Sequence, residues 1–192
     1  MRASEDSRDA AIRPAIVAAE DLASRLDAFA ALLHACVHAG ASVNFVMPFP
    51  EAEARAFWER KVLPAVRDGA RVLLAAESGE RIVGTVQLAL DTPPNQPHRA
   101  EVSKLLVDPA FRRRGIARAL MAAVEQVAAA LGRSLLTLDT RTGDHAEPLY
   151  ASLGYVTAGT IPGYCRDPFA DRLDATTIMY KRLEVPEAML EA

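Results

Sequence analysis

The chain has 192 residues, of which 51% are hydrophobic, enough to bury one substantial core but short for two independent domains. Lys and Arg total 22 against 25 Asp and Glu, a net charge of -3. This balance excludes a strong basic field, so neither nucleic acid nor an anionic membrane is an expected partner. The only cysteines, Cys36 and Cys165, lack metal-ligand spacing, which argues against a disulfide framework or a structural zinc site.

The polar first nine residues lead into no signal-type apolar segment, and no apolar stretch reaches membrane-spanning length. We therefore expect a soluble, cytoplasmic protein. A single domain is predicted over residues 11–183, with flexible tails at residues 1–10 and 184–192 where hydrophobic periodicity is lacking.

In chain order, Ala11–Ala19 is a candidate first strand. An amphipathic helix follows from Asp21 and ends before Gly40, a residue suited to a left-handed cap. Its apolar stripe recurs at three- and four-residue steps: Leu22, Leu26, Phe29, Leu33 and Val37. A second helix opens at Pro50 and is kinked or ends near Pro64.

Arg71–Glu77 and Arg81–Leu90 are apolar runs joined by a short loop that contains glycine, which predicts an antiparallel hairpin. A proline-rich turn, Thr92–Pro97, closes this unit. The next run, Ala100–Val107, predicts a third strand.

A helical stripe runs from Ile116 to Leu131, and Ser134–Thr140 is a strong strand candidate. With the strand Ala100–Val107 before the helix, this order predicts a parallel strand pair with a right-handed crossover. A short helix, Glu147–Leu153, follows. Two further runs, Tyr155–Ile161 and Asp174–Leu183, flank a loop at residues 162–173 and predict an antiparallel hairpin at the sheet edge.

Between the strand that ends at Val107 and the helix from Ile116 lies the segment Arg112–Ala117, with three arginines and one glycine. The free N–H groups and the positive dipole end of the helix would point at an anion there. Gly115 lets the backbone approach a phosphate closely, and the arginine side chains can close over its charge. The plainer interpretation is a solvated, basic helix start.

The segment Arg112–Ala117 resembles the phosphate-binding loop of the GNAT acetyltransferases, and Leu149–Tyr155 resembles the aromatic–Gly–aromatic signature of that family. The resemblance covers residues 71–183. It implies an α/β fold with a twisted, mixed but mostly antiparallel sheet of about six to seven strands, a splayed parallel pair and about four flanking helices. It also implies acetyl-CoA as co-substrate and transfer of its acetyl group to a primary amine of a small molecule.

On this resemblance, the cofactor-binding residues are Leu105, Leu106, Val107, Arg112, Arg113, Arg114, Gly115, Ile116, Ala117 and Arg118. The pantetheine arm would lie as a pseudo-strand between the splayed strands, with backbone partners on Leu105 and Val107. One departure stands out, because many relatives carry an Asn before the last helix, where this chain reads Gly143-Asp144-His145-Ala146.

Four further segments resemble the tabtoxin-resistance acetyltransferases, which acetylate an amino-acid-like β-lactam toxin: His38–Val43, Arg99–Val102, Leu136–Thr140 and Pro162–Cys165. This likeness implies a role in toxin resistance. Other amines, such as polyamines, aminoglycosides or peptide N-termini, stay open as acceptors, because fold alone does not choose among them. A non-catalytic acyl-CoA-binding regulator and a homodimer are also compatible with the sequence.

Tyr150 corresponds to the tyrosine of the family that faces the thiolate, and its phenol is protonated at neutral pH, so it can act as the acid. The alternative is that Tyr150 packs beside Tyr155 in the core. For the base we favour Glu101 and Asp139, carboxylates in otherwise apolar strands. Counting along the parallel strands places them well apart unless a bulge changes the register.

Structural alternatives for these carboxylates are surface pairing of Glu101 with Lys104 or Arg99 and, for Asp139, a strand-end acceptor role. His34 and His38 lie four residues apart with no third ligand in sight, so no metal is expected. Direct transfer is favoured over an acyl intermediate on Cys165, which has no activating neighbour in sequence.

Overall fold

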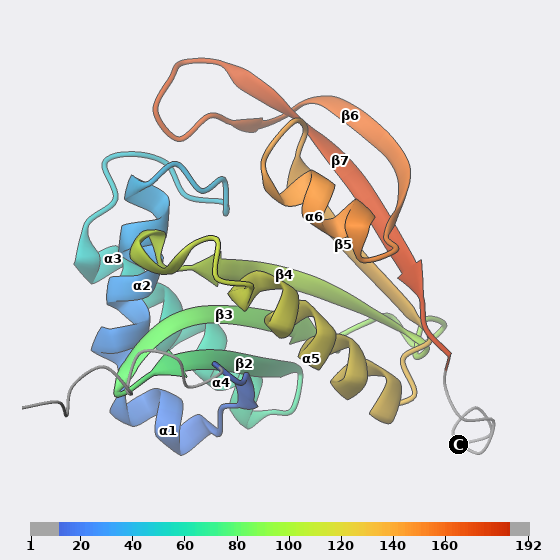
Figure 1. Cartoon of the computed structure of the whole chain (residues 1–192), viewed down its shortest axis with the longest axis horizontal. Coiled ribbons are helices and arrows are strands. Elements are labelled where there is room, and N and C mark those ends of the chain that lie inside the picture. Colours follow the sequence, from blue (N-terminus) through green and yellow to red (C-terminus); the bar gives the residue numbers. More distant parts are fainter. Residues whose placement is uncertain (1–11, 185–192) are drawn as a thin grey trace, which may run out of the picture.

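A computed structural model describes residues 12–184, and the tails predicted at residues 1–10 and 184–192 lie outside this range apart from Glu184. One seven-stranded sheet has the order β1-β2-β3-β4-β5-β7-β6 (Figure 1). Its strands are β1 (Ala15–Ile16), β2 (Arg71–Ser78), β3 (Arg81–Ala89), β4 (Arg99–Val107), β5 (Leu135–Arg141), β6 (Val156–Arg166) and β7 (Leu173–Arg182). Only β4 and β5 pair in parallel among the described strands, which confirms the predicted mixed, mostly antiparallel sheet.

The helices cover both faces of the sheet (Figure 1). They are α1 (Ala19–Ser24), α2 (Leu26–His38), α3 (Glu51–Phe57), the π-helical segment η1 (Trp58–Val62), α4 (Leu63–Arg67), α5 (Ile116–Ala130) and α6 (Ala146–Ser152). Successive strand residues point to opposite faces, and β2 shows the division. Leu73 and Ala75 join a core with α1 to α4, whereas Leu74 and Ala76 join a second core with α5 and α6.

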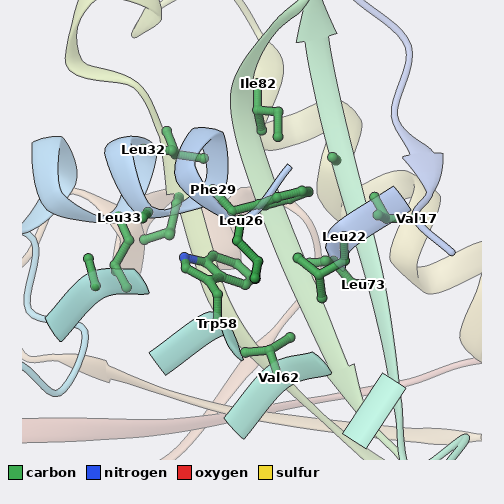
Figure 2. Close-up of a cluster of buried hydrophobic side chains, with 14 of the residues drawn as sticks. Val17, Leu22, Leu26, Phe29, Leu32, Leu33, Trp58, Val62, Leu73 and Ile82 are labelled. Carbon is green, nitrogen blue, oxygen red and sulfur yellow. The ribbon is translucent and has the colours of Figure 1, made fainter. Parts of the chain in front are cut away.

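Aromatic packing dominates the first core, where the rings of Phe29 on α2 and Trp58 on η1 lie 5.0 Å apart. Figure 2 shows both side chains among aliphatic residues contributed by α1, α2, η1, β2 and β3. Trp58 is fully buried. Trp58 is therefore a core residue. The buried side chains around it hold the N-terminal helices against the sheet.

The predicted N-terminal helices differ from the structure in two details. The first is divided at Arg25, whose backbone leaves the helical region (φ -121°, ψ 25°) and whose guanidinium pairs with Glu77 on β2 at 2.8 Å. The second continues through Pro64 to Arg67. Proline removes an N–H and clashes with the carbonyl four residues earlier, and the wider π-helical turn of η1 lies at this point.

The sheet edges also depart from the predicted bounds. The first strand shrinks to two residues beside β2, after Pro14, and the β6–β7 hairpin is longer than expected, so that its loop covers only residues 167–172. Pro162 is tolerated inside β6 because β6 is an edge strand with a register shift between Ile161 and Cys165.

Candidate active site

The parallel strands β4 and β5 pair over only three positions, from Arg99 opposite Leu135 to Glu101 opposite Thr137. Beyond them, β4 contains Lys104 in the left-handed region (φ 51°), and the register against β3 shifts at the same level. A bulge of this kind bends a strand and ends regular pairing. The carboxyl ends of β4 and β5 therefore diverge (Figure 1).

The backbone of β4 beside this divergence is oriented by its bonds to β3. The N–H of Asp108 donates to the carbonyl of Val83 at 2.9 Å. Because consecutive residues of an antiparallel strand direct their backbone groups to alternate sides, Val107 directs its groups away from β3, toward the gap. The Cys36 thiol of α2 donates to the Val107 carbonyl at 3.4 Å. The side chain of Leu106 is buried in the first core.

Asp108 organises the turn that follows β4. Its carboxylate accepts the N–H of Ala110 at 2.9 Å and an Arg81 guanidinium at 2.5 Å, which closes the 3-10 turn η2 (Pro109–Phe111). The Arg114 guanidinium lies 4.9 Å over the Phe111 ring. Asp108 thus fixes the start of the turn, while the arginines that follow are exposed.

The predicted phosphate loop leads directly into α5. Arg112, Arg113, Arg114 and Gly115 are exposed, and Arg113 and Gly115 have positive φ angles of 65° and 79°. No side chain within residues 12–184 caps α5, and a Cβ added at Gly115 would meet nothing within 4 Å. Free helix N–H groups, open space in front of them and flanking guanidinium groups suit a phosphate.

The other predicted loop residues contribute differently. Ile116 is 2% exposed and joins the second core, so only its backbone faces the loop. Arg118 donates to the Ser152 hydroxyl at 2.9 Å and thereby connects α5 to α6.

Close packing of α5 on the sheet depends on Gly84 in β3. A Cβ at this position would lie 2.9 Å from the side chains of Ile116 and Leu120 and 3.0 Å from the Leu106 carbonyl oxygen. The absence of a side chain at Gly84 therefore sets how near the start of α5 lies to β3.

Tyr150 on α6 is 7% exposed, and its ring lies 5.8 Å from that of Tyr155. Burial raises the pKa of the Tyr150 phenol above its ordinary value, and the charges of Asp139 and Asp144 raise it further. The packing contact with Tyr155, predicted as the alternative to an acid role, is thus formed. Tyr150 remains a neutral proton donor at physiological pH.

Glu101 and Asp139 lie nearer to each other than counting along the strands indicates. Glu101 is opposite Thr137, and Asp139 is only two residues further along β5. Two residues of a strand rise about 6.6 Å between their Cα atoms. Residues two apart share a face, so both carboxylates lie on the sheet face that carries α1 to α4. The expectation of a wide separation was wrong, because the strand register sets Glu101 opposite Thr137, two residues before Asp139.

Both carboxylates are exposed. The Thr176 hydroxyl of β7 donates its single proton to the Thr140 carbonyl at 2.9 Å, and its oxygen lies 3.4 Å from an Asp139 carboxylate oxygen. Among the ion pairs found within residues 12–184, none involves Glu101, so its predicted surface pairing with Lys104 or Arg99 is not formed.

Lys104 is a site residue that the sequence reasoning treated only as a surface partner. Burial lowers the pKa of its ammonium, an effect that the charges of Asp139 and Glu101 oppose and that of Arg71 strengthens. The ammonium lies 5.8 Å from the centre of the Phe57 ring. A lysine within an apolar strand was the only sequence signal, and its left-handed backbone is visible only in the structure.

Two loops approach each other beside the carboxylates. The N–H of Met47, between α2 and α3, donates to the Pro168 carbonyl in the β6–β7 loop at 3.0 Å. Asp167 shapes this loop by accepting the N–H groups of Phe169 and Ala170 at 2.8 and 2.9 Å. The bond from Phe169 is the main cause that lowers the pKa of Asp167.

Arg141, at the end of β5, connects these loops to the sheet. Its guanidinium lies 3.4 Å from Asp144 and 3.7 Å from both Asp167 and Asp174. Asp144 accepts the N–H of His145 at 2.6 Å and pairs with Arg141. Asp144 serves the local structure before α6.

The rings of His34 and His38 lie 3.9 Å apart between their centres and are tilted by 34°. Within the described residues no three metal-ligating side chains cluster. Between residues 12 and 184, none of the helices combines the length and the apolar character needed to cross a membrane.

A family model described as the acetyltransferase (GNAT) family matches residues 34–155. N-acetyltransferase 8 of Homo sapiens is 42% identical over 86 residues, which are 44% of this chain and 38% of that protein. The chain thus spans about 38% of the length of the curated relatives that it matches.

Solved structures resemble the whole fold. An N-acetyltransferase from Staphylococcus aureus Mu50 has a TM-score of 0.74 at 19% identity and covers 91% of this chain and 100% of its own. The protein yncA from Salmonella typhimurium, solved with its cofactor acetyl-CoA, has a TM-score of 0.69 at 19% identity and covers 93% and 99%. At such identities the likeness establishes the fold alone.

Proposed function

The chain belongs to the GNAT acetyltransferase family, and we propose that it transfers the acetyl group of acetyl-CoA to a primary amine of a small molecule. One observation carries this proposal. The uncapped start of α5 follows the carboxyl end of β4, where β4 diverges from β5, and the charge of Asp139 on β5 acts on the Tyr150 phenol. An anion site, a strand-shaped gap and acid–base groups are the parts that acyl transfer from a CoA thioester requires.

The residues present fit acetyl-CoA. The N–H groups at the start of α5 and the guanidinium groups of Arg112, Arg113 and Arg114 would hold the pyrophosphate, because both are free to meet an anion. Backbone groups of Leu105 and Val107 would hold the pantetheine arm in the manner of a strand. The co-substrate supplies an activated thioester carbonyl, and the protein supplies orientation and proton transfer.

Asp139 is our proposed general base. A carboxylate accepts a proton from an ammonium group and leaves the nitrogen lone pair free to attack a carbonyl carbon. Glu101, on the same face and about two strand residues away, would hold the acceptor ammonium. Tyr150 would donate its phenolic proton to the departing sulfur, and its raised pKa keeps that proton in place at neutral pH.

For the acceptor we propose an amino-acid-like compound of the tabtoxin type, which would make the enzyme a cytoplasmic toxin-resistance factor. This finer proposal rests on the resemblance of four sequence segments. An enzyme that acts on a polyamine, an aminoglycoside or a peptide N-terminus is the first alternative. A regulator that binds acyl-CoA without turnover is the second.

Thiol release from acetyl-CoA, followed with a chromogenic disulfide across a panel of amines, tests these proposals. We expect turnover of tabtoxinine-β-lactam to exceed that of spermidine and of an aminoglycoside. The reverse ranking would defeat the toxin-type acceptor, and turnover of no amine despite calorimetric binding of CoA would favour the regulator.

A further inference from the structure

Polar side chains from four neighbouring strands share the sheet face beside the proposed base. Arg71 on β2 and Glu101 on β4 both lie opposite Ala89 of β3, and Glu101 in turn lies opposite Thr137 of β5. Gln87 on β3 is opposite Ser103, one residue before Lys104. A row of polar groups thus crosses the sheet toward Asp139.

Gln87 is fully buried, although it is polar. Its side-chain carbonyl accepts the Arg71 guanidinium at 2.6 Å, but its amide nitrogen has no acceptor within residues 12–184, and neither has Nε of Arg71. A buried donor without a partner destabilises the fold, and an acceptor that reaches it removes that cost. The β2–β3 side of the row therefore holds unused hydrogen-bond donors.

Lys104, on β4 between the two sides of this row, adds a second cation. The left-handed backbone of Lys104 places its ammonium near Phe57, and Arg71 and Lys104 lie near enough to repel each other's charge. Two cations within one half-buried cluster disfavour the approach of a polycationic ligand. They favour a planar anion that accepts several hydrogen bonds at once, and a carboxylate meets that requirement.

The two carboxylates supply the complementary charge, because Asp139 and Glu101 lie on the same face on the β4–β5 side of the row. We infer that the acceptor is a zwitterion whose carboxylate binds Arg71, Gln87 and Lys104 while Asp139 and Glu101 hold its ammonium. This inference rests on the proposed transfer reaction. It assigns three residues to substrate selection and disfavours polyamine and aminoglycoside acceptors.

The first test uses the unmodified protein with paired acceptors. Glycine, L-threonine, L-methionine, L-phenylalanine and alanyl-alanine are compared as free acids and as primary amides, together with tabtoxinine-β-lactam. The amine of an α-amide is less basic and therefore more often deprotonated at pH 8, so a preference for the acid must come from binding. We expect kcat/KM to favour the acid by about tenfold or more, the effect of one charged hydrogen bond.

The second test asks whether Arg71 causes that preference. In Arg71→Gln the acid-to-amide ratio should fall to near one, whereas the exposed control Arg67→Gln should retain the ratio of the unmodified protein. If circular dichroism shows that Arg71→Gln is unfolded, Lys104→Met takes its place.

The outcomes are distinguishable. Equal use of acid and amide, or an Arg71→Gln variant that slows both forms equally, would overturn the carboxylate site and leave the transfer reaction intact. Preference for spermidine over every amino acid would overturn it as well. No thiol release with any amine would remove the proposed reaction and this inference together.

Discussion

Gly84→Ala is the change that most directly probes how the phosphate loop is positioned. The new methyl group would lie 2.9 Å from Ile116 and Leu120 and 3.0 Å from the Leu106 carbonyl oxygen. The two side chains are 2% and 0% exposed and have little room to rotate away, and the third atom is backbone. Overpacking of this kind costs about 1–3 kcal/mol, so we expect a loss of that size in the free energy of unfolding.

Urea unfolding followed by circular dichroism measures this loss by linear extrapolation. The matched control is Gly159→Ala on β6, where an added Cβ meets nothing within 4 Å and should change stability little. Because the strain falls on the first residue of α5, calorimetry should also show weaker CoA binding for Gly84→Ala alone. Equal stability of the two variants would refute the argument that α5 can pack here only because position 84 has no side chain.

The remaining predictions concern single side chains. Tyr150→Phe should lower kcat about a hundredfold with CoA affinity retained, and an unchanged kcat would remove its acid role. Asp139→Asn should mainly lower kcat and Glu101→Gln mainly raise KM for the amine, so the opposite pattern would exchange their roles. Burial raises the pKa of the Cys36 thiol from 9.0 to about 12, so at pH 8 an aromatic disulfide should label Cys165 in the folded protein and Cys36 only after unfolding. Because the Cys36 thiol ionises at a lower pH in the unfolded chain than in the folded one, the free energy of unfolding should fall as pH rises from 9.0 toward about 12. A flat alkaline stability profile would contradict this expectation.

Local patterns in the sequence predicted most of the elements. The β2–β3 hairpin, α5 and β5 occur within one or two residues of the predicted bounds, because strand alternation, the helical stripe and turn glycines are properties of short segments. The break at Arg25 was not predictable in this way, because its partner Glu77 lies on a distant strand.

The features of the candidate site also differ in whether local sequence predicts them. The proposed phosphate loop could be placed from the chain alone, since a strand, an arginine-rich turn with Gly115 and a helix follow one another directly. The short offset between Glu101 and Asp139 was not, because strand register depends on how the whole sheet packs.

The sequence by itself therefore determined where an anion would meet a helix start, because that arrangement requires only neighbouring residues and their backbone preferences. Tertiary structure decided which side chains meet across the sheet. Arg71, Gln87 and Lys104 come from three strands, and each is unremarkable in its own segment. Their proximity depends on strand register and on the left-handed backbone at Lys104, which arise from packing between segments distant in the chain.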